Sequence, residues 1–203
     1  MKNRKIKIVE CPRDAMQGLK EFIPTQQKAD YINSLMKVGF DIIDFGSFVS
    51  HKAVPQMRDT SQLVDLLEIK EKTSLLSIIV NKKGALDASV FEQVKILGYP
   101  LSISEIFQKK NSNRDINTSL ELIDDLQNIC IRKNKTLLIY FSMAFGNPYG
   151  EIWSPNILLD HIDKVIDKGI TMISIADTIG NSTPESIKSI YTNISSIFPK
   201  IDI

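Results

Sequence analysis

Cysteine, histidine and tryptophan are scarce in this chain, whose 203 residues include two cysteines, two histidines and one tryptophan. Cys11 and Cys130 lie far apart and have no CxxC spacing, so the sequence predicts neither a disulfide framework nor a zinc site. Cys130 falls on the apolar stripe of a predicted helix and is expected in the core. For Cys11 we expect a buried, inert thiol rather than a catalytic one.

Long apolar runs are absent as well. After the basic residues 1–5, the chain enters the alternating stretch Ile6–Val9 without the apolar core of a secretory signal. No other stretch approaches the roughly 20 apolar residues that a membrane-spanning helix needs. We therefore expect a cytoplasmic protein that does not bind a membrane.

An excess of charge of one sign is also missing. The chain holds 25 Lys and Arg against 24 Asp and Glu, a net charge of +1, so no bulk field would draw it to nucleic acid. Any anionic ligand must be held by local groups. With 43% hydrophobic residues and no long linker, residues 1–203 are predicted to form one domain.

What the sequence does contain is a regular alternation of apolar, strand-like runs with amphipathic helical segments. The runs are Ile6–Val9, Phe40–Phe45, Leu75–Val80, Leu101–Ile106, Leu137–Phe141 and Met172–Ala176. An uninterrupted βαβα order requires a parallel sheet with crossover helices. The sheet could close into a barrel or stay open as a doubly wound sheet, and periodicity does not separate the two.

The number of units bears on that choice. Six βα units are followed by Lys200–Ile203, which begins like a seventh strand. A (β/α)₈ barrel needs eight strands and typically ~250 residues. If the fold is a barrel, the chain is expected to end about two units early.

Polar residues gather directly after the predicted strands, where parallel α/β folds place their active sites. They include Arg13, Asp14, Asp44, Ser47, Ser104 and Asp177, which we expect on one rim of the sheet. In an adjacent Arg-Asp pair, the carboxylate can ligate Mg²⁺ or Mn²⁺ while the guanidinium binds an oxyanion, a combination suited to enolate chemistry. Alternatively, Arg13 and Asp14 pair with each other or with neighbours, and Asp44 and Asp177 accept bonds from nearby backbone amides.

Several stretches, in order along the chain, resemble the hydroxymethylglutaryl-CoA lyases. They are Ile8-Val9-Glu10 with Pro12-Arg13-Asp14 and Gln17, then Ser47-Phe48-Val49-Ser50 with Val54-Pro55-Gln56-Met57, and Asp177-Thr178-Ile179-Gly180 with Thr183-Pro184. The second stretch is the most specific to that family. The resemblance covers essentially the whole chain and implies an α/β fold of (β/α)₈ TIM-barrel type, with about six βα units present and the last two missing.

The resemblance also implies a reaction, the retro-Claisen cleavage of 3-hydroxy-3-methylglutaryl-CoA to acetoacetate and acetyl-CoA. Arg13 would neutralise the carbonyl oxygen as the enolate forms, and Asp14 would ligate a divalent cation, Mg²⁺ or Mn²⁺, which raises the acidity of the substrate hydroxyl. Asp44 and Asp177 would be the candidate base and orienting carboxylate. Substrate-binding or supporting roles would fall to Arg13, Gln17, Ser47, Ser104, Ser174 and Thr178.

The sequence differs from the family pattern at several positions that bear on the predicted activity. Asp44 stands where glutamate is usual, Cys11 where glycine is usual, and Ala15-Met16 replace Gly-Leu. The paired histidines of the seventh strand, a later cysteine acid and the last metal-binding asparagine have no counterparts. His51 is expected to be exposed and His161 to lie on a helix flank, so neither replaces them.

The main hypothesis is therefore a hydroxymethylglutaryl-CoA lyase-like protein, whose activity in this 203-residue form is doubtful. Two alternatives stay open beside it. One is a related acyl-CoA or 2-keto-acid lyase or aldolase of the same superfamily. The other is a non-catalytic remnant that binds coenzyme A or a partner chain. In each case, self-association through open barrel edges is expected.

Overall fold

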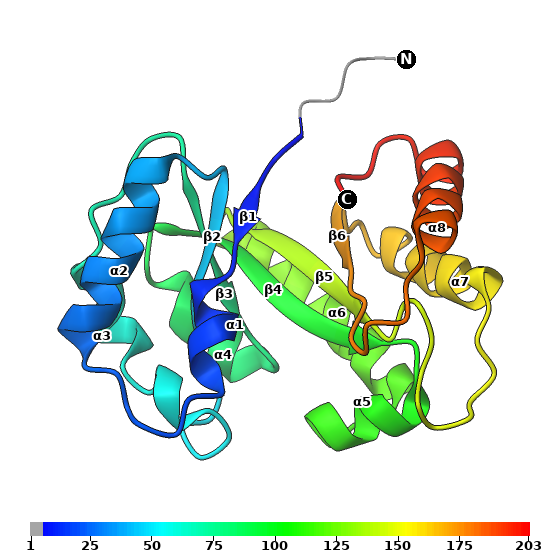
Figure 1. Cartoon of the computed structure of the whole chain (residues 1–203), viewed down its shortest axis with the longest axis horizontal. Helices are drawn as coiled ribbons and strands as arrows, with labels where there is room; N and C mark the ends of the chain where they lie inside the picture. Colours follow the sequence, from blue (N-terminus) through cyan, green and yellow to red (C-terminus); the bar gives the residue numbers. More distant parts are fainter. Residues whose placement is uncertain (1–5) are drawn as a thin grey trace. The chain divides into compact units, whose positions relative to one another are not determined.

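The computed structural model describes residues 6–203 and contains six strands that follow one another in chain order across the sheet. Figure 1 traces them from the amino to the carboxyl end. They are β1 Val9–Glu10, β2 Ile42–Ser47, β3 Ser74–Ile78, β4 Val94–Ser102, β5 Thr136–Ser142 and β6 Met172–Ile175.

The sequential order of the strands decides between the two predicted sheet types. The pairs β1–β2, β2–β3 and β5–β6 are parallel, and the order β1-β2-β3-β4-β5-β6 never reverses. A doubly wound sheet reverses its strand order at a switch point, whereas a barrel winds in one direction. The six predicted βα units are therefore present and wound as in a barrel.

The described chain divides into two compact units, residues 6–97 with 133–135 and residues 98–132 with 136–203. The first unit holds α1 Pro12–Gln17, α2 Thr25–Val38, the 3₁₀ turn η1 Pro55–Met57, α3 Thr60–Asp65 and α4 Lys82–Ser89. The second holds α5 Glu105–Ser112, α6 Ile116–Arg132, α7 Pro155–Ile166 and α8 Pro184–Ile197. In the first unit, α2 packs beside α3 (Figure 1).

Each unit has its own apolar core. In the first, Ile43 and Phe45 of β2 and Leu75 of β3 are fully buried, as is Ile32 of α2. In the second, Ile139 and Phe141 of β5 are fully buried, as are Leu126 of α6 and Ile162 of α7. These residues are the apolar positions that the strand and helix periodicities marked.

The predicted bounds of the fourth strand are wrong. The strand predicted at Leu101–Ile106 begins earlier, at Val94, and ends at Ser102. Ser104 stops it, because its side chain accepts the amide of Phe107 and so begins α5.

The last residues behave as the predicted start of another strand. Asp202 forms a parallel bridge with Met172 of β6, its amide donating to the carbonyl of Thr171 at 2.9 Å. Within residues 6–203, no helix is long and apolar enough to cross a membrane.

Candidate active site

Arg13 and Asp44 form a buried ion pair between α1 and β2. Nε of Arg13 lies 3.2 Å from both carboxylate oxygens of Asp44, and Nη2 lies 2.5 Å from Oδ2. The Asp44 side chain is 1% exposed and that of Arg13 is 11% exposed. Such a forked contact holds the guanidinium plane in one orientation.

Burial and pairing act on Asp44 in opposite directions. Removal from water raises the pKa of the Asp44 carboxyl, and the hydrogen bonds and charge of Arg13 oppose that rise. Removing one partner of a buried pair of this kind typically costs about 3–5 kcal/mol, because the other charge stays buried and unpaired. Arg13 therefore favours the ionised form of Asp44.

Arg13 also reaches two residues of its own helix. Its Nη1 donates to Oδ1 of Asp14 at 2.8 Å and to Oε1 of Gln17 at 2.9 Å. Gln17 is one helical turn after Arg13, so the two side chains share a face of α1. The alternative in which Arg13 pairs with its neighbours is confirmed, and the pairing brings four of the predicted residues together.

Asp14 carries the only metal-ligand role predicted from the sequence. Its carboxylate is 65% exposed, and it offers the hard oxygen that Mg²⁺ and Mn²⁺ prefer. However, residues 6–203 contain no group of three His, Cys, Asp or Glu side chains that could hold an ion. Asp14 can thus supply one ligand to a cation, but residues 6–203 do not form a complete cation site.

The predicted burial of Cys11 is wrong, because the residue is exposed. Its thiol nevertheless has a pKa raised to about 11, chiefly by partial burial and then by the Asp44 carboxylate nearby. A thiol with such a pKa is almost wholly protonated near neutrality and a poor nucleophile. Cys130, in contrast, is buried as predicted.

Ser47 lies at the end of β2 and has an unusual environment. Its amide donates to Oγ1 of Thr60 at 3.2 Å, but its own Oγ is buried and has no partner among the described residues. Thr60 packs so closely that a side chain at Gly46 would meet it at 2.6 Å. A buried hydroxyl without a partner costs about 1–3 kcal/mol, so Ser47 is a candidate for contact with a ligand.

Sequence reasoning missed the role of Gln56, which ties the segment after α1 to η1. Its Oε1 accepts the amide of Ile23 at 2.9 Å, and its Nε2 donates to the carbonyl of Glu21 at 2.8 Å. The signal is the Val54-Pro55-Gln56-Met57 stretch, which resembles the family but whose local pattern does not reveal these contacts.

Lys28 of α2 also contacts Gln56 of η1 and the residue that precedes α3. Its ammonium group is fully buried, donates to the carbonyl of Gln56 and pairs with Oδ1 of Asp59 at 2.7 Å. It also lies 4.2 Å from the centre of the Phe22 ring. A buried lysine with these partners positions η1 and α3 relative to α2.

Ser104, Ser174, Asp177 and Thr178 belong to the second unit. Ser104 caps α5 and donates to the carboxylate of Glu151, whose Oε1 accepts the amide of Ile106 at 3.1 Å. Glu151 was not anticipated from the sequence.

Asp177 begins a tight turn after β6. Its two carboxylate oxygens accept the amides of Asn181 and Ser182, each at 2.9 Å. Hydrogen bonds, above all from Ser182, lower the pKa of this carboxyl. The alternative in which Asp177 accepts backbone amides is confirmed, whereas its place on a rim shared with Arg13 stays a prediction.

Thr178 supports an unusual backbone conformation at the end of β5. Its Oγ1 accepts the amide of Met143 at 2.7 Å, and Met143 is a buried residue with φ of 60°. A long side chain rarely adopts that conformation, so Thr178 stabilises a strained turn. Ser174 is half-buried within β6.

The two histidines lie where they were expected. His51 is exposed in the loop after β2. His161 is half-buried on α7, with Nδ1 2.8 Å from the carbonyl of Ile157 one turn earlier. Neither joins Arg13 and Asp44.

Parallel strands wound in one direction, with an Arg–Asp pair after the first two, define an α/β protein of the barrel class. The family model described as HMGL-like matches residues 5–203, and the chain belongs to this family. That assignment agrees with the resemblance seen in the sequence.

Curated relatives agree with the family. The mitochondrial hydroxymethylglutaryl-CoA lyase of Bos taurus is 32% identical over 194 residues, 94% of this chain and 59% of that protein. The Bacillus subtilis hydroxymethylglutaryl-CoA lyase YngG is 27% identical, with 97% of this chain and 66% of that protein covered. The chain thus spans 59–66% of the length of these two relatives.

Solved structures confirm the fold class. The crystal structure of a Bacillus subtilis HMG-CoA lyase has a TM-score of 0.91 at 26% identity and covers 97% of this chain and 67% of that one. An Acinetobacter baumannii HMG-CoA lyase in complex with coenzyme A and 3-methylmalate has a TM-score of 0.89 at 27% identity, covering 96% and 64%. The predicted (β/α)₈ barrel class is confirmed by these likenesses.

Proposed function

We propose that this protein is a carbon–carbon lyase that cleaves 3-hydroxy-3-methylglutaryl-CoA to acetoacetate and acetyl-CoA. The observation that carries the proposal is the forked Arg13–Asp44 pair beside Asp14, in a chain of the HMGL-like family. Relatives named hydroxymethylglutaryl-CoA lyase support it.

Arg13 would stabilise the charge that develops during cleavage. When the tertiary hydroxyl of the substrate loses its proton, the C–C bond breaks, the hydroxyl carbon becomes the ketone of acetoacetate, and the bonding electron pair forms the enolate of acetyl-CoA. A proton then converts this enolate to acetyl-CoA. A guanidinium whose plane is held by Asp44 would favour the transition state if it donates to the enolate oxygen.

The carboxylates would have distinct tasks. Asp14, the exposed member of the cluster, would supply one oxygen ligand to Mg²⁺ or Mn²⁺, and the bound cation would make the substrate hydroxyl more acidic. Asp177 is proposed as the base or orienting group near that hydroxyl. Its lowered pKa keeps it ionised but makes it a weaker base, which favours the orienting role.

The test is turnover of 3-hydroxy-3-methylglutaryl-CoA by the purified protein with Mn²⁺ or Mg²⁺, followed by detection of both acetoacetate and acetyl-CoA. Arg13→Gln should abolish most of the turnover, whereas Arg132→Gln, in the last turn of α6, should not. Wild-type protein that forms neither product at any cation concentration would contradict the proposal.

A second candidate function is binding of coenzyme A without catalysis. It is favoured by the observation that residues 6–203 hold no three-ligand metal cluster. A protein that binds coenzyme A but does not release acetoacetate would support it. A related lyase or aldolase would instead turn over another acyl-CoA or 2-keto acid in the same assay.

We also propose a cytoplasmic location. The support is a Rattus norvegicus relative named as a cytoplasmic 3-hydroxy-3-methylglutaryl-CoA lyase, 30% identical over 96% of this chain. Fractionation of cells that express the full natural protein tests it.

A further inference from the structure

The helix α1 carries Arg13 and Asp14, but its own residues do little to fix its position. It is six residues long, and the side chain of Cys11, which precedes it, forms no capping hydrogen bond. A helix of this length is not stable by itself. Its orientation therefore depends on what holds it, and the structure places β2 and η1 against it.

Gln56 of η1 fastens the segment 19–23, which leads from α1 to α2. Its Nε2 donates to the carbonyl of Glu21 at 2.8 Å and to that of Leu19 at 3.4 Å. Its Oε1 accepts the amide of Ile23 at 2.9 Å. Gln56 is 3% exposed, so water does not compete for these bonds. One buried carboxamide thus holds the segment at its beginning, middle and end.

Phe22 attaches the same segment a second time. The centre of its ring lies 4.2 Å from Nζ of Lys28 and 3.7 Å from the guanidinium carbon of Arg58. Cations at such distances are attracted by the electrons of the ring. Both cations lie near the first attachment, because Lys28 donates to the carbonyl of Gln56 and Arg58 follows Gln56 by two residues. The segment after α1 is therefore held by polar and by aromatic contacts.

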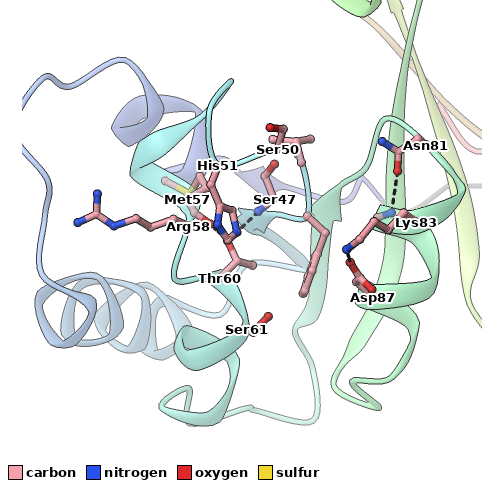
Figure 2. A pocket seen from close by; sticks show the side chains of 13 residues that line it. Ser47, Ser50, His51, Met57, Arg58, Thr60, Ser61, Asn81, Lys83 and Asp87 are labelled. Atoms are coloured by element: carbon pink, nitrogen blue, oxygen red, sulfur yellow. Dashed lines mark hydrogen bonds and ion pairs between the residues drawn. The ribbon is translucent and has the colours of Figure 1, made fainter.

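Thr60 fixes η1 in turn to β2. Its Oγ1 donates to the carbonyl of Met57 at 2.8 Å and accepts the amide of Ser47 at 3.2 Å. Figure 2 shows these three residues together, with Arg58 directed away from Ser47. Met57 is 2% exposed, so this attachment also lies in the interior. Ser47 ends β2, the strand that carries Asp44.

These contacts close a ring that begins and ends at Asp44. The ring runs along β2 to Ser47 and through Thr60 to η1. From Gln56 it crosses to the segment after α1, and the guanidinium of Arg13 returns it to Asp44. A shift of α1 relative to β2 therefore strains one of these hydrogen bonds. Gln56 joins the part of the ring that holds Asp44 to the part that holds Arg13.

We propose that Gln56 is a positioning residue, which holds α1 in place so that the Arg13 guanidinium stays on Asp44. Its effect on turnover rests on the proposed function, whereas its effect on α1 can be measured without turnover. Gln56 acts on the helix through the backbone of residues 19–23 and not on the substrate. Since a misplacement of about 1 Å can cost about 10²-fold in rate, a small movement of α1 is sufficient to impair Arg13.

Hydrogen exchange of the whole 203-residue protein tests the positioning without turnover. Gln56→Met removes the three hydrogen bonds and keeps a side chain of similar length. The amides of residues 12–17 should exchange about tenfold faster in this variant, because α1 opens locally, while those of β3 and α4 should change little. Unchanged exchange of residues 12–17 would overturn the role of Gln56 and leave the lyase function standing. Equal acceleration throughout the first unit would also overturn it, since that is global destabilisation.

Asn33→Leu is the matched control, because Asn33 of α2 forms a similar pair of contacts in the same unit. Its Nδ2 donates to the carbonyl of Leu66 at 3.0 Å, and its Oδ1 accepts the amide of Glu68 at 2.8 Å. These contacts tie α2 to the segment after α3 and not to α1. Asn33→Leu should therefore speed exchange after α3 and leave the exchange of residues 12–17 unchanged.

Phe22→Leu is a milder variant, which keeps the Gln56 hydrogen bonds and removes the two cation contacts. It should speed the exchange of residues 12–17 about threefold. If Gln56→Met does not fold, this variant decides. Faster exchange then supports the positioning of α1 by the segment that Gln56 holds, and unchanged exchange overturns it.

Steady-state kinetics connect the positioning to the reaction. Gln56→Met should lower kcat about tenfold with little change in KM, whereas Asn33→Leu should change neither. In the Arg13→Gln background, Gln56→Met should lower kcat no further, because the two residues act as a unit. A loss of the same size in both backgrounds would overturn the proposal, since Gln56 would then act independently of Arg13. Wild-type protein without turnover, combined with faster exchange of α1 in Gln56→Met, would support the positioning and contradict the lyase function.

Discussion

Asp44 reaches Arg13 directly, with Oδ2 2.5 Å from Nη2, although aspartate is one methylene shorter than the glutamate usual at this position. One methylene fewer shortens the reach of the carboxylate by about 1.5 Å, the length of a C–C bond, and a displacement of that size is large enough to matter for catalysis. The structure shows that the pair closes nonetheless. Arg13 extends to Asp44 from α1 while keeping its contacts with Asp14 and Gln17.

Loss of Arg13 should therefore be costly for stability as well as for turnover. Arg13→Gln should lower the free energy of unfolding by about 3–5 kcal/mol, because Asp44 would remain buried without its cation. Since the pKa of Asp44 would then rise further, the loss should be smaller at about pH 5 than at about pH 8. Urea denaturation at both pH values measures this, and a loss of the same size at both would contradict it. Asp44→Asn in the same background should restore part of the stability.

Turnover supplies a separate prediction for the same residue. In protein that cleaves the substrate, Arg13→Lys or Arg13→Gln should reduce kcat about 10²–10³-fold with little change in KM, because the guanidinium acts on charge that appears in the transition state. Steady-state kinetics separate the two constants. An unchanged kcat with a raised KM would show that Arg13 only binds the ground state.

Asp177 should stabilise the fold in a pH-dependent way. Its folded pKa is lowered by hydrogen bonds from the turn, so its contribution is present above the unfolded pKa and is lost as the pH falls through the folded value. The difference in unfolding free energy between wild type and Asp177→Asn should therefore be greater at about pH 7 than at about pH 3. Equal differences at the two pH values would show that ionisation of Asp177 does not contribute.

Cys11 should react slowly despite its exposure. With a pKa of about 11, the thiol should be alkylated by iodoacetamide at a rate that keeps rising with pH well above neutrality. Asp44→Asn should shift the profile to lower pH, because the Asp44 carboxylate raises that pKa. Cys130→Ser is the background for these measurements, and a rate that levels off near pH 8 would contradict the prediction.

Replacing Lys28 alone should cost more stability than replacing Lys28 and Asp59 together. Lys28→Met should destabilise the protein by about 3–5 kcal/mol, because the buried Asp59 carboxylate loses its cation. The double variant Lys28→Met/Asp59→Leu should be clearly more stable than Lys28→Met alone. Chemical denaturation of the wild type, both single variants and the double variant decides, and additive losses would show that the two residues do not interact.

The chemistry of individual positions was determined by the sequence itself. Alternating apolar runs predicted six βα units, and the Arg13-Asp14 pair and the Ser47–Met57 stretch indicated the family, because these patterns are local. Self-association stays a prediction from the edge position of β1, where Ile8 is exposed.

Only the tertiary structure decided which groups meet. The contact of Arg13 with Asp44 joins residues 31 positions apart, and the contacts of Gln56 with the segment after α1 join residues even farther apart along the chain. Local propensity carries no information about such distances, so neither contact could be read from the sequence. The same holds for the fourth strand, where Ser104 looked like part of an apolar run until its hydroxyl was seen to cap α5. Periodicity determined the elements, and packing determined the site.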